Sequence, residues 1–410
     1  GRIVFTSTRS GAHVMCFSSH IDTLHTMNST GGGIQCISVN NQNEFDPAVL
    51  PDGRIMYGRW EYIDKTALYM QSLWTSNPDG SEETALFGNN MAKPTAFLDA
   101  RPVPGSALVV ASLTPHNGQS VGAIAMIDPR VGKNALQAIT NFTPEYPTEM
   151  DQGVKHGPCD PWPLNEDFIL IANNAPAHGK HGVIELIDRF GFRTVIRREA
   201  DISCFAPMLV KARPLPLLAP AVRHDGEPAR FLVHDIYKGM QGVSRGEVKR
   251  LRIVETTARL SGIPPGGRWW NQAFLVSWQG SYDIKRFLGT VPVEEDGSAY
   301  FEAPPGKALY FQALDDDGRL IQSQRTFVQA VPGVTRSCVG CHINDGNVAP
   351  ESTARPLALE RPAEKIRAED WGSGFLDYPT RVQPVLDRNC VRCHGGEKDI
   401  AGGIDLSGGW

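Results

Sequence analysis

Short apolar or alternating runs, separated by Gly, Pro, Asp and Asn, fill the first 330 residues of the chain. Examples are residues 2–6, 54–57, 107–111, 122–127, 168–172, 183–187, 231–234, 274–278 and 309–314. Runs of this length and spacing predict β-strands, and no convincing amphipathic helical pattern interrupts them. The pattern therefore predicts an all-β architecture up to about residue 330.

The strand pattern also repeats along the chain. Residues 45–57, 100–110 and 160–171 each combine a proline-containing entry with a following strand, and the unit recurs about every 50–60 residues, as four-stranded propeller blades do. Three or four blades can be identified, and about five to seven would fill the segment. Asp296-Gly297 and Asp317-Gly318 are hairpin signals, which favour a non-repeating β-module at the end of the propeller.

Two segments of the chain lack the strand pattern. Residues 212–220, inside the β-rich part, are rich in Pro and Leu and predict a connection, and residues 343–361, after it, predict an irregular linker. Residues 380–389 predict a short helix that ends at Cys390. We therefore divide the chain into a β-propeller with a terminal β-module (1–330), a first attachment region and linker (331–354) and a small, mainly helical or irregular segment like cytochrome c (355–410).

Composition excludes two classes of partner. Hydrophobic residues make up 41% of the 410 residues and charged residues 21%, which is normal for a folded globular protein. The formal net charge of −5, without a cluster of Lys and Arg, argues against nucleic-acid binding. No run of about 18 apolar residues occurs, so we expect no membrane span.

Two copies of one five-residue motif carry the most specific chemical signal. C-x-x-C-H is the attachment signature of haem c, in which both thiols bond to the porphyrin and the His lies under the ring as an iron ligand. A thioredoxin-like redox pair needs no following His, and the pairs are much farther apart than those of a zinc ribbon. The sequence thus predicts two covalent haems c. The thiols are Cys338, Cys341, Cys390 and Cys393, and the ligands of the haem iron are His342 and His394.

The remaining ligands of the two irons are open at this stage. After His342 the only His is His394, and no Met follows Met240. A sixth ligand must therefore come from the propeller, from a partner chain or from residues beyond Trp410, or else a coordination site is open. We expect the C-terminal segment to be truncated. Haem c is attached outside the cytoplasm, so we expect a periplasmic or other extracytoplasmic location and a leader that has been removed.

Three residues of the propeller are candidate catalytic or pocket residues. His116 lies in a loop between strands, where it can face a cofactor or stabilise the turn. Cys159 and Asp160 open a blade close to His156, and this set could bind a metal such as zinc or calcium, or be a buried thiol beside a turn-capping carboxylate. We call the two five-residue motifs the first pentad (338–342) and the second pentad (390–394). Four further cysteines lie outside the pentads and could form disulfides or remain free thiols: Cys16, Cys36, Cys159 and Cys204.

Most of the chain resembles the alpha subunit of hydrazine synthase and its propeller-haem homologues. The resemblance rests on residues 43–54, 111–119, 143–151, 288–301 and 308–314, and on the passage from there into residues 335–342. It implies a six-bladed propeller with one haem c at its edge and a second haem c in a C-terminal cytochrome domain. The Asp-Gly turns alone would also fit propellers of the TolB type, which carry no haem, and the pentads distinguish the two.

One position departs from this family. The resemblance implies a Tyr ligand for the catalytic haem iron four residues after the His of the pentad, but that position is Gly346 here. No Tyr lies between His342 and Tyr378. We therefore expect His342 to ligate its own iron, and the motif for hydrazine synthesis does not carry over.

These observations predict a dihaem redox protein that exchanges electrons with other c-type cytochromes or with subunits of a multihaem complex. Chemistry on a small nitrogen or oxygen species at the propeller-edge haem would make it an oxidoreductase. Two alternatives remain open, namely a non-catalytic electron-transfer or structural subunit, and a sensor or binding propeller that uses haem to detect a ligand.

Overall fold

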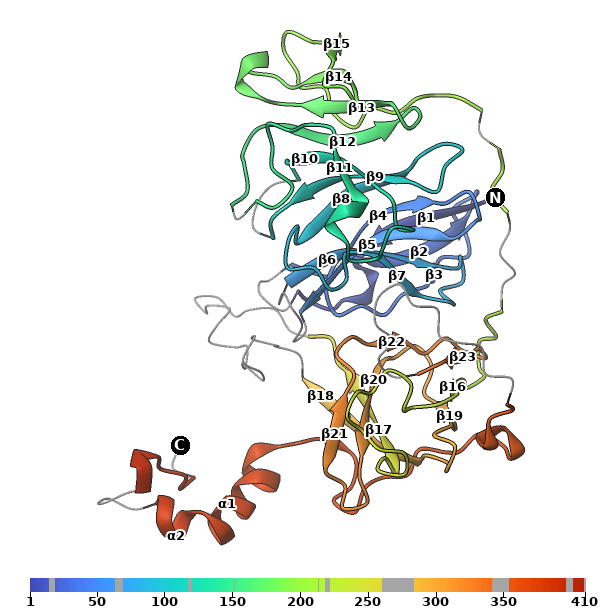
Figure 1. The fold of residues 1–410 in the computed structure, drawn as a ribbon, viewed down its shortest axis with the longest axis vertical. Coiled ribbons are helices and arrows are strands. Elements are labelled where there is room, and N and C mark those ends of the chain that lie inside the picture. Colours follow the sequence, from blue (N-terminus) through green and yellow to red (C-terminus); the bar gives the residue numbers. More distant parts are fainter. Residues whose placement is uncertain are drawn as a thin grey trace.

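The computed structural model describes residues 1–14, 19–62, 69–116, 120–150, 152–212, 214–217, 222–259, 284–340, 354–395 and 401–408. Figure 1 shows four sheets one after another in the N-terminal half, a second β-unit below them and a helical segment at the C-terminal end. The predicted mostly β fold with a small helical end is confirmed.

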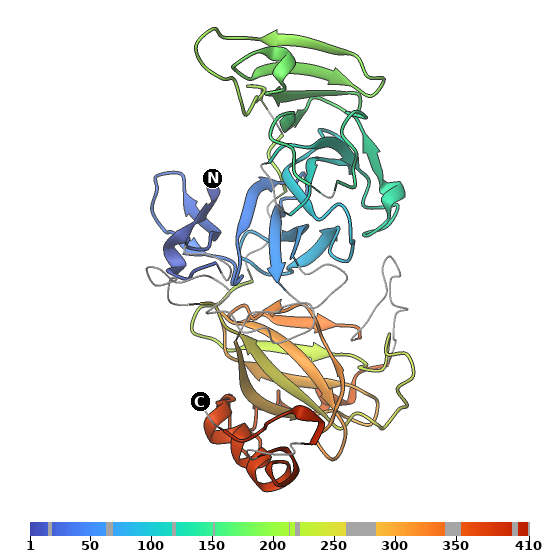
Figure 2. The same cartoon turned by 90° about the vertical axis from the view of Figure 1, so that its left-hand side faces the viewer.

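Each of the first four sheets is an antiparallel meander, because neighbouring strands follow one another along the chain (Figure 2). The first has β1 (Arg2–Ser7), β2 (Thr23–Asn28) and β3 (Gln35–Cys36). The second has β4 (Glu44–Val49), β5 (Ile55–Tyr62), β6 (Tyr69–Ser76) and β7 (Thr84–Phe87), and the third has β8 (Ala96–Pro102), β9 (Val109–Thr114), β10 (Ala123–Ile127) and β11 (Ile139–Asn141). The fourth has β12 (Pro158–Pro163), β13 (Phe168–Asn173), β14 (Val183–Asp188) and β15 (Arg193–Arg197). One parallel bridge, Gln71 to Ala96, joins the second and third sheets. Single-turn helices lie in the connections: η1 (Thr8–Ser10), η2 (Leu136–Ala138) and η3 (Pro176–His178).

The first strands of three of these sheets share a backbone irregularity. Asp46 in β4, Asp99 in β8 and Asp160 in β12 have φ angles of 50°, 52° and 49°, and the strand register shifts at each of them. Asp is one of the few residues that tolerates this left-handed conformation. The backbone N–H of Asp99 donates to the Asp46 carboxylate at 3.0 Å, which ties the third sheet to the second. The repeat recognised in the sequence is therefore a structural repeat.

The resemblance implied six blades, whereas the described residues contain four blade-like sheets. After β15 the described residues form no further strand until β16, which belongs to the second β-unit. The count of three or four blades that the repeat itself supported agrees with this arrangement. The last strand of this repeat in the described residues is β15, which ends at Arg197, and the second β-unit follows where a terminal β-module was predicted.

The second β-unit has two sheets that share one apolar core. One sheet has the order β19 (Ala299–Ala303), β16 (Ala229–Val233) and β23 (Thr335–Cys338). The other contains β21 (Leu320–Ser323), β20 (Ala308–Leu314), β17 (Arg250–Thr256), β18 (Lys285–Pro292) and β24 (Gly374–Phe375), and β22 (Val328–Gln329) pairs with β20. The rings of Phe231, Phe301 and Phe311 pack together with centroids 5.2–5.6 Å apart. Such aromatic packing holds the two sheets face to face.

The two Asp-Gly turns of this unit have different roles. Asp317-Gly318 connects β20 to β21, which pair antiparallel, so the predicted hairpin is confirmed. Asp296-Gly297 forms a tight turn, but β18 pairs with β17 and β19 pairs with β16. This turn therefore carries the chain from one sheet to the other and does not close a hairpin. A turn motif specifies only the local reversal, and the partner of each strand is set by the core.

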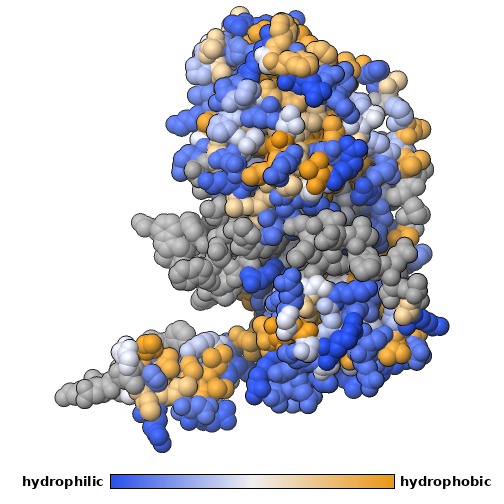
Figure 3. All heavy atoms as spheres, viewed as in Figure 1, coloured by the Kyte–Doolittle hydropathy of each residue, from blue (hydrophilic) through white to orange (hydrophobic). Residues whose placement is uncertain are grey.

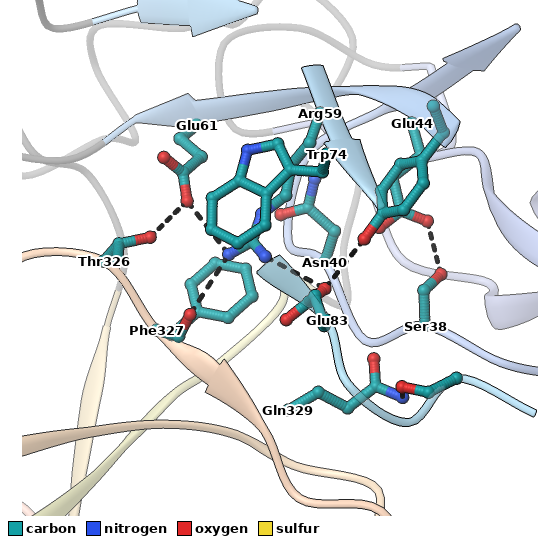
Figure 4. Close-up of polar contacts among 12 residues, drawn as sticks. Ser38, Asn40, Glu44, Arg59, Glu61, Trp74, Glu83, Thr326, Phe327 and Gln329 are labelled. Carbon is teal, nitrogen blue, oxygen red and sulfur yellow. Dashed lines mark hydrogen bonds and ion pairs between the residues drawn. The ribbon is translucent and has the colours of Figure 1, made fainter. Parts of the chain in front are cut away.

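A buried ionic cluster joins the N-terminal sheets to the second β-unit (Figure 4). Arg59 on β5 is fully buried and forms ion pairs with Glu61 at 2.9 Å and Glu83 at 3.0 Å. Its guanidinium carbon lies 4.0 Å from the centroid of the Trp74 ring and 3.8 Å from that of Phe327, a residue of the second unit. Stacking between two aromatic faces suits the planar, weakly hydrated guanidinium.

Further hydrogen bonds cross the same junction. Thr326 donates to Glu61 at 2.5 Å, and the Gln329 amide donates to the carbonyl of Ile37 at 2.8 Å. Arg336, two residues before Cys338, donates to the backbone carbonyl of Glu83. These hydrogen bonds across the boundary fix the position of β23 relative to the N-terminal sheets.

Glu44 lies at the edge of this cluster and makes the stability of the fold depend on pH. Burial raises the pKa of Glu44 to about 7, although hydrogen bonds from Ser38 and from the backbone of Leu24 oppose the shift. The folded chain therefore keeps a proton that an unfolded carboxyl, with a pKa of about 4.3, has already lost. We expect the free energy of unfolding to fall by about 3 kcal/mol as the pH rises from about 4.5 to about 7, and to level off above that.

Urea unfolding between pH 4.5 and pH 8 measures this dependence. The Glu44→Gln variant is expected to lose about 3 kcal/mol of this pH dependence, because its side chain cannot titrate, and to keep the part that comes from Asp99, whose pKa burial also raises to about 7. Glu145→Gln, which changes a half-exposed carboxylate, is the matched control and should keep the slope. Equal slopes in the wild type and the Glu44→Gln variant would show that Glu44 is ionised in the folded chain at low pH.

The C-terminal segment begins with an irregular strap along the second β-unit and ends in short helices. This irregular segment, residues 354–377, includes η5 (Leu357–Glu360), and hydrogen bonds between the backbones of Arg367 and Thr290 join it to β18. A π-helical turn (Tyr378–Val382), α1 (Gln383–Asn389), α2 (Val391–His394) and η7 (Ala401–Gly403) follow. Within the described part of the chain, no helix is long and apolar enough to cross a membrane.

Candidate functional site

The second pentad lies at the end of the helix predicted for residues 380–389. Asp377 caps the π-helical turn that leads into this helix, α1, by accepting hydrogen bonds from the backbone N–H and the hydroxyl of Thr380, at 3.0 and 2.6 Å. Pro384 lies in its first turn, where the missing N–H costs nothing. α1 then ends at Asn389 and delivers Cys390, so this prediction is confirmed.

Cys390 is the hinge between α1 and α2. Its φ of −121° and ψ of −38° interrupt the helix, and its carbonyl accepts hydrogen bonds from the N–H groups of Cys393 at 3.1 Å and His394 at 2.9 Å. Residues three apart on a helical turn lie on the same face. Both thiols are therefore presented from one turn of backbone, with Cys390 partly buried and Cys393 exposed.

His394 is held by the segment that follows it. The backbone N–H of Leu406 donates to the His394 carbonyl at 2.6 Å, and the Gln383 amide donates to the Leu406 carbonyl at 2.9 Å. The Nδ1 atom of His394 is buried and has no hydrogen-bond partner among the described residues. Burial of Nδ1 leaves Nε2 as the nitrogen able to bind an external group.

These residues fit a covalently attached haem. Two thiols on one turn followed by an imidazole are the donor set that haem c requires, and no disulfide between Cys390 and Cys393 competes with it. Apolar side chains also gather over the C-terminal segment in Figure 3, among them Phe375, Leu376 and Val385, which are 46–54% exposed. Exposed apolar surface of this kind is typical of a site that a cofactor or partner covers.

The first pentad begins at the end of β23. β23 pairs in parallel with β16, which brings Cys338 beside Val233. The backbone carbonyl of Cys338 accepts a hydrogen bond from the backbone N–H of His234 at 2.8 Å. Burial raises the pKa of the Cys338 thiol, an effect that Arg336 partly opposes. Cys341, His342 and the departure at Gly346 lie outside the described residues.

Cys338 lines a cavity of about 50 Å³ in the core of the second β-unit, together with Met240, Phe311 and Gly340. Ligand sites usually measure about 300–1,000 Å³, so this space is too small for a porphyrin. Gly340 lies so close to Lys238 that a Cβ would approach its carbonyl oxygen within 2.4 Å. A haem attached here would therefore have its ring outside this cavity.

A larger cleft of about 550 Å³ separates one side of α1 from the sheet of β17, β18 and β20. Phe287, Trp371 and Val385 contribute apolar walls, and Arg252 and Arg388 contribute positive charge. Arg252 is already paired with Glu369 at 2.6 and 2.7 Å. Cys390, Cys393 and His394 are not among the residues that line this cleft.

His116 is held inside the N-terminal sheets and does not lie free on a surface loop. Its ring is hydrogen-bonded to Tyr62 at 3.4 Å and to Gln71 at 3.3 Å, and lies 5.3 Å from the Trp60 ring. Burial lowers the pKa of His116 to about 4, so the imidazole is neutral at pH 7. The residues that follow it, 117–119, lie outside the described part.

Cys159 and Asp160 open β12, as predicted, beside Asp99. Burial, reinforced by Asp160 and Asp99, raises the pKa of Cys159 to about 12, and this thiol is not a nucleophile at neutral pH. Burial together with Asp46 and Asp160 raises the pKa of Asp99 to about 7. The described residues contain no group of three or more His, Cys, Asp or Glu side chains arranged for a metal ion. Cys36, Cys159 and Cys204 are free thiols, and Cys16 lies outside the described part.

Sequence reasoning missed two features of this region. The junction around Arg59 joins residues up to 292 positions apart, and no local pattern signals such contacts. The left-handed Asp residues, in contrast, do have a signal, because Asp46 and Asp160 are each followed by Pro. The repeat could have predicted the special backbone at these positions.

Comparison with known proteins gives a consistent result. Residues 246–343 match the model of the hydrazine synthase alpha subunit middle domain. Hydrazine synthase subunit alpha of Kuenenia stuttgartiensis is 20% identical over 476 aligned residues, which cover 91% of this chain and 57% of that protein. The structure of Kuenenia stuttgartiensis hydrazine synthase is similar with a TM-score of 0.78 and 17% identity over 100% of this chain and 65% of that chain. TolB from Acinetobacter baumannii matches 47% of this chain and 39% of that chain, with a TM-score of 0.31 and 13% identity.

The predicted resemblance to the hydrazine synthase alpha subunit is thus confirmed, and the two proteins share their fold. The chain spans a little over half of the length of its curated relative.

Proposed function

On the premise of this resemblance, we propose that the chain is an extracytoplasmic dihaem c-type redox protein that transfers electrons within a multi-subunit complex. The observation that carries the proposal is the second pentad, in which Cys390, Cys393 and His394 stand on one turn of backbone with Nδ1 of the imidazole buried. The first pentad adds Cys338, at the end of a strand that the Arg59 cluster fixes in place.

The residues of the second site have separate tasks. Cys390 and Cys393 would form the two thioether bonds, and Nε2 of His394 would bind the iron from one side. A bound haem supplies one-electron transfer at its iron. Gln383 and Leu406 hold the backbone of His394 and so set the orientation of the imidazole, as groups around an iron ligand do.

At the first site we assign Cys338 and Cys341 to thioether bonds and His342 to the iron. His116, Cys159 and Asp160 receive no catalytic role in this proposal. His116 is neutral and enclosed by Tyr62 and Gln71, and the Cys159 thiol is protonated. Zinc or calcium binding near Cys159 stays a prediction.

Hydrazine synthesis is not part of the proposal. Gly346 stands where the resemblance implies a Tyr ligand, and the chain covers only part of its relative. Electron transfer needs only the attached haems and a surface that receives a partner, whereas synthesis needs a complete reaction site. The relative is named as a subunit, which supports assembly with other chains here.

Visible absorption and EPR spectra of the purified chain, oxidised and reduced, with and without carbon monoxide, test the proposal. We expect two haems per chain and low-spin spectra that do not respond to the gas, because electron-transfer haems usually carry two axial ligands. A high-spin component that binds carbon monoxide would overturn the electron-transfer assignment and make one haem a reaction site. A chain purified without haem absorbance from a host that matures cytochromes c would contradict the whole proposal.

A further inference from the structure

The extended segment at residues 203–210 occupies the place that the first strand of a fifth blade-like sheet would have. The backbone N–H of Ala206 donates to the Asp160 carboxylate at 2.9 Å, just as Asp99 donates to Asp46 at 3.0 Å. Ala206 also has a φ of 48°, which matches the three Asp residues of the earlier sheets. An Ala in this left-handed conformation is strained, so the surrounding structure must impose it.

The sequence supports the same equivalence. Phe205-Ala206-Pro207 corresponds to Phe45-Asp46-Pro47 and to Cys159-Asp160-Pro161. The segment is fastened to the fourth sheet, because Cys204 donates to the Gly182 carbonyl at 2.9 Å and the Gly182 N–H donates to the Ser203 hydroxyl at 3.1 Å. Residues 203–210 therefore continue the blade repeat by one strand.

Within the part of the chain that the structure describes, no strand pairs with this segment as the later strands of each earlier sheet pair with its first strand. In the earlier sheets β4, β8 and β12 pair antiparallel with β5, β9 and β13, the strands that follow them. After Val210 the described residues form no strand until β16, whose two neighbours are already β19 and β23. The relative aligns over 476 positions, more than the 410 residues of this chain, so it carries internal residues that this chain lacks.

The segment is consequently apolar and uncovered. Phe205 is 75% exposed, Met208 60% and Val210 94%, whereas Phe45, the counterpart of Phe205, packs against the core around Trp60. An extended, exposed apolar strand is a template for pairing with another chain, and native proteins normally cover or charge such edges.

We propose that residues 203–210 are a docking strand, to which an extended β-strand of a partner polypeptide with a different sequence adds antiparallel to build a fifth blade. The chemistry of the occupant follows from the repeat: it is a mainly apolar strand, because β5, which pairs with β4 as Phe45 with Gly58 and Ala48 with Met56, is buried along its whole length. In the same register the added strand lies opposite Phe205 and Met208. Main-chain bonds supply affinity in this mode of recognition, and alternate side chains supply specificity. The proposal uses neither pentad and stands apart from the redox function.

A peptide with the sequence of residues 53–62, which contains β5, is the probe. We expect a fluorescent form of it to bind the full holo-protein in an anisotropy titration, and hydrogen exchange to show new protection at residues 203–210. Met208 corresponds to Ala48 of β4, whose partner on β5 is Met56. Met208→Pro removes the backbone N–H at this position, which would face the added strand, so the affinity for the peptide should fall about tenfold. Leu215→Pro is the matched control, because Leu215 also follows a proline and is 94% exposed. This variant should bind as the wild type does.

Three results would overturn the proposal. Equal binding to both variants would mean that the peptide adheres to apolar surface without forming a strand. Protection outside residues 203–210, or no binding at all, would remove the docking strand. A wild-type dimer that Met208→Pro converts to a monomer would assign the segment to a second copy of this chain. Circular dichroism of each variant establishes that the fold is retained.

Discussion

A chain carrying both Cys390→Ser and Cys393→Ser is expected to hold about half of the covalent haem of the wild type. Serine has nearly the shape of cysteine but forms no thioether. The pentad backbone should survive, because Cys390 acts there through its carbonyl, which accepts from Cys393 and His394. The loss should therefore concern the second haem alone.

The measurement is the pyridine haemochrome content per chain, with a haem stain of the denatured protein to separate covalent from bound haem. Cys36→Ser and Cys204→Ser, which change free thiols outside the pentads, are matched controls and should leave the haem content unchanged. His394→Ala should keep the covalent haem and change its spectrum, since it removes an iron ligand and no attachment point. Wild-type haem content in the double serine variant would exclude this site as an attachment point.

Arg59→Met is expected to lower the free energy of unfolding by about 3–5 kcal/mol. The change leaves Glu61 and Glu83 buried without their cation and removes the stacking on Trp74 and Phe327. Burial opposes the charge of Arg59, but Glu83 and Glu61 outweigh it and hold the pKa of the guanidinium above its ordinary value. The cation is thus integral to the fold at every pH where the chain is folded.

Urea unfolding at pH 7 measures this loss. Arg54→Ala is the control, because Arg54 on the same part of the chain forms an exposed pair with Asp52 that is worth at most about 1 kcal/mol. Adding Glu61→Gln and Glu83→Gln to Arg59→Met should restore part of the stability, because no buried charge then lacks a partner. A loss below about 1 kcal/mol for Arg59→Met would show that the carboxylates are protonated or solvated when Arg59 is absent.

The sequence predicted the features that depend on local pattern. Alternating runs identified strands within the described residues, whereas the run at 274–278 lies outside them, and the helix before Cys390 followed from residues 380–389. The number of blades could not be predicted in this way, because a blade is defined by the strands that pair with its first strand. Ala206 illustrates this, since it continues the repeat while the partner strands expected after it are missing from the described residues.

Long-range packing explains the other differences. Asp296-Gly297 has the composition of a hairpin turn, yet the core of the second unit draws β18 and β19 into different sheets. His116 was expected in a loop with room to face a cofactor, but aromatic rings from neighbouring strands enclose it. Burial of this kind depends on residues 45 to 54 positions away, which no short motif encodes.

The parallel pairing of β16 with β23 constrains the order in which the protein can mature. β16 is complete at Val233, but its neighbour ends only at Cys338, so this sheet closes late in synthesis. Once it closes, the Cys338 thiol faces the core and burial keeps it protonated. If haem is attached at Cys338, the thioether must therefore form before these two strands meet. The maturation machinery would then act on an unfolded segment, and final folding would seal the bond.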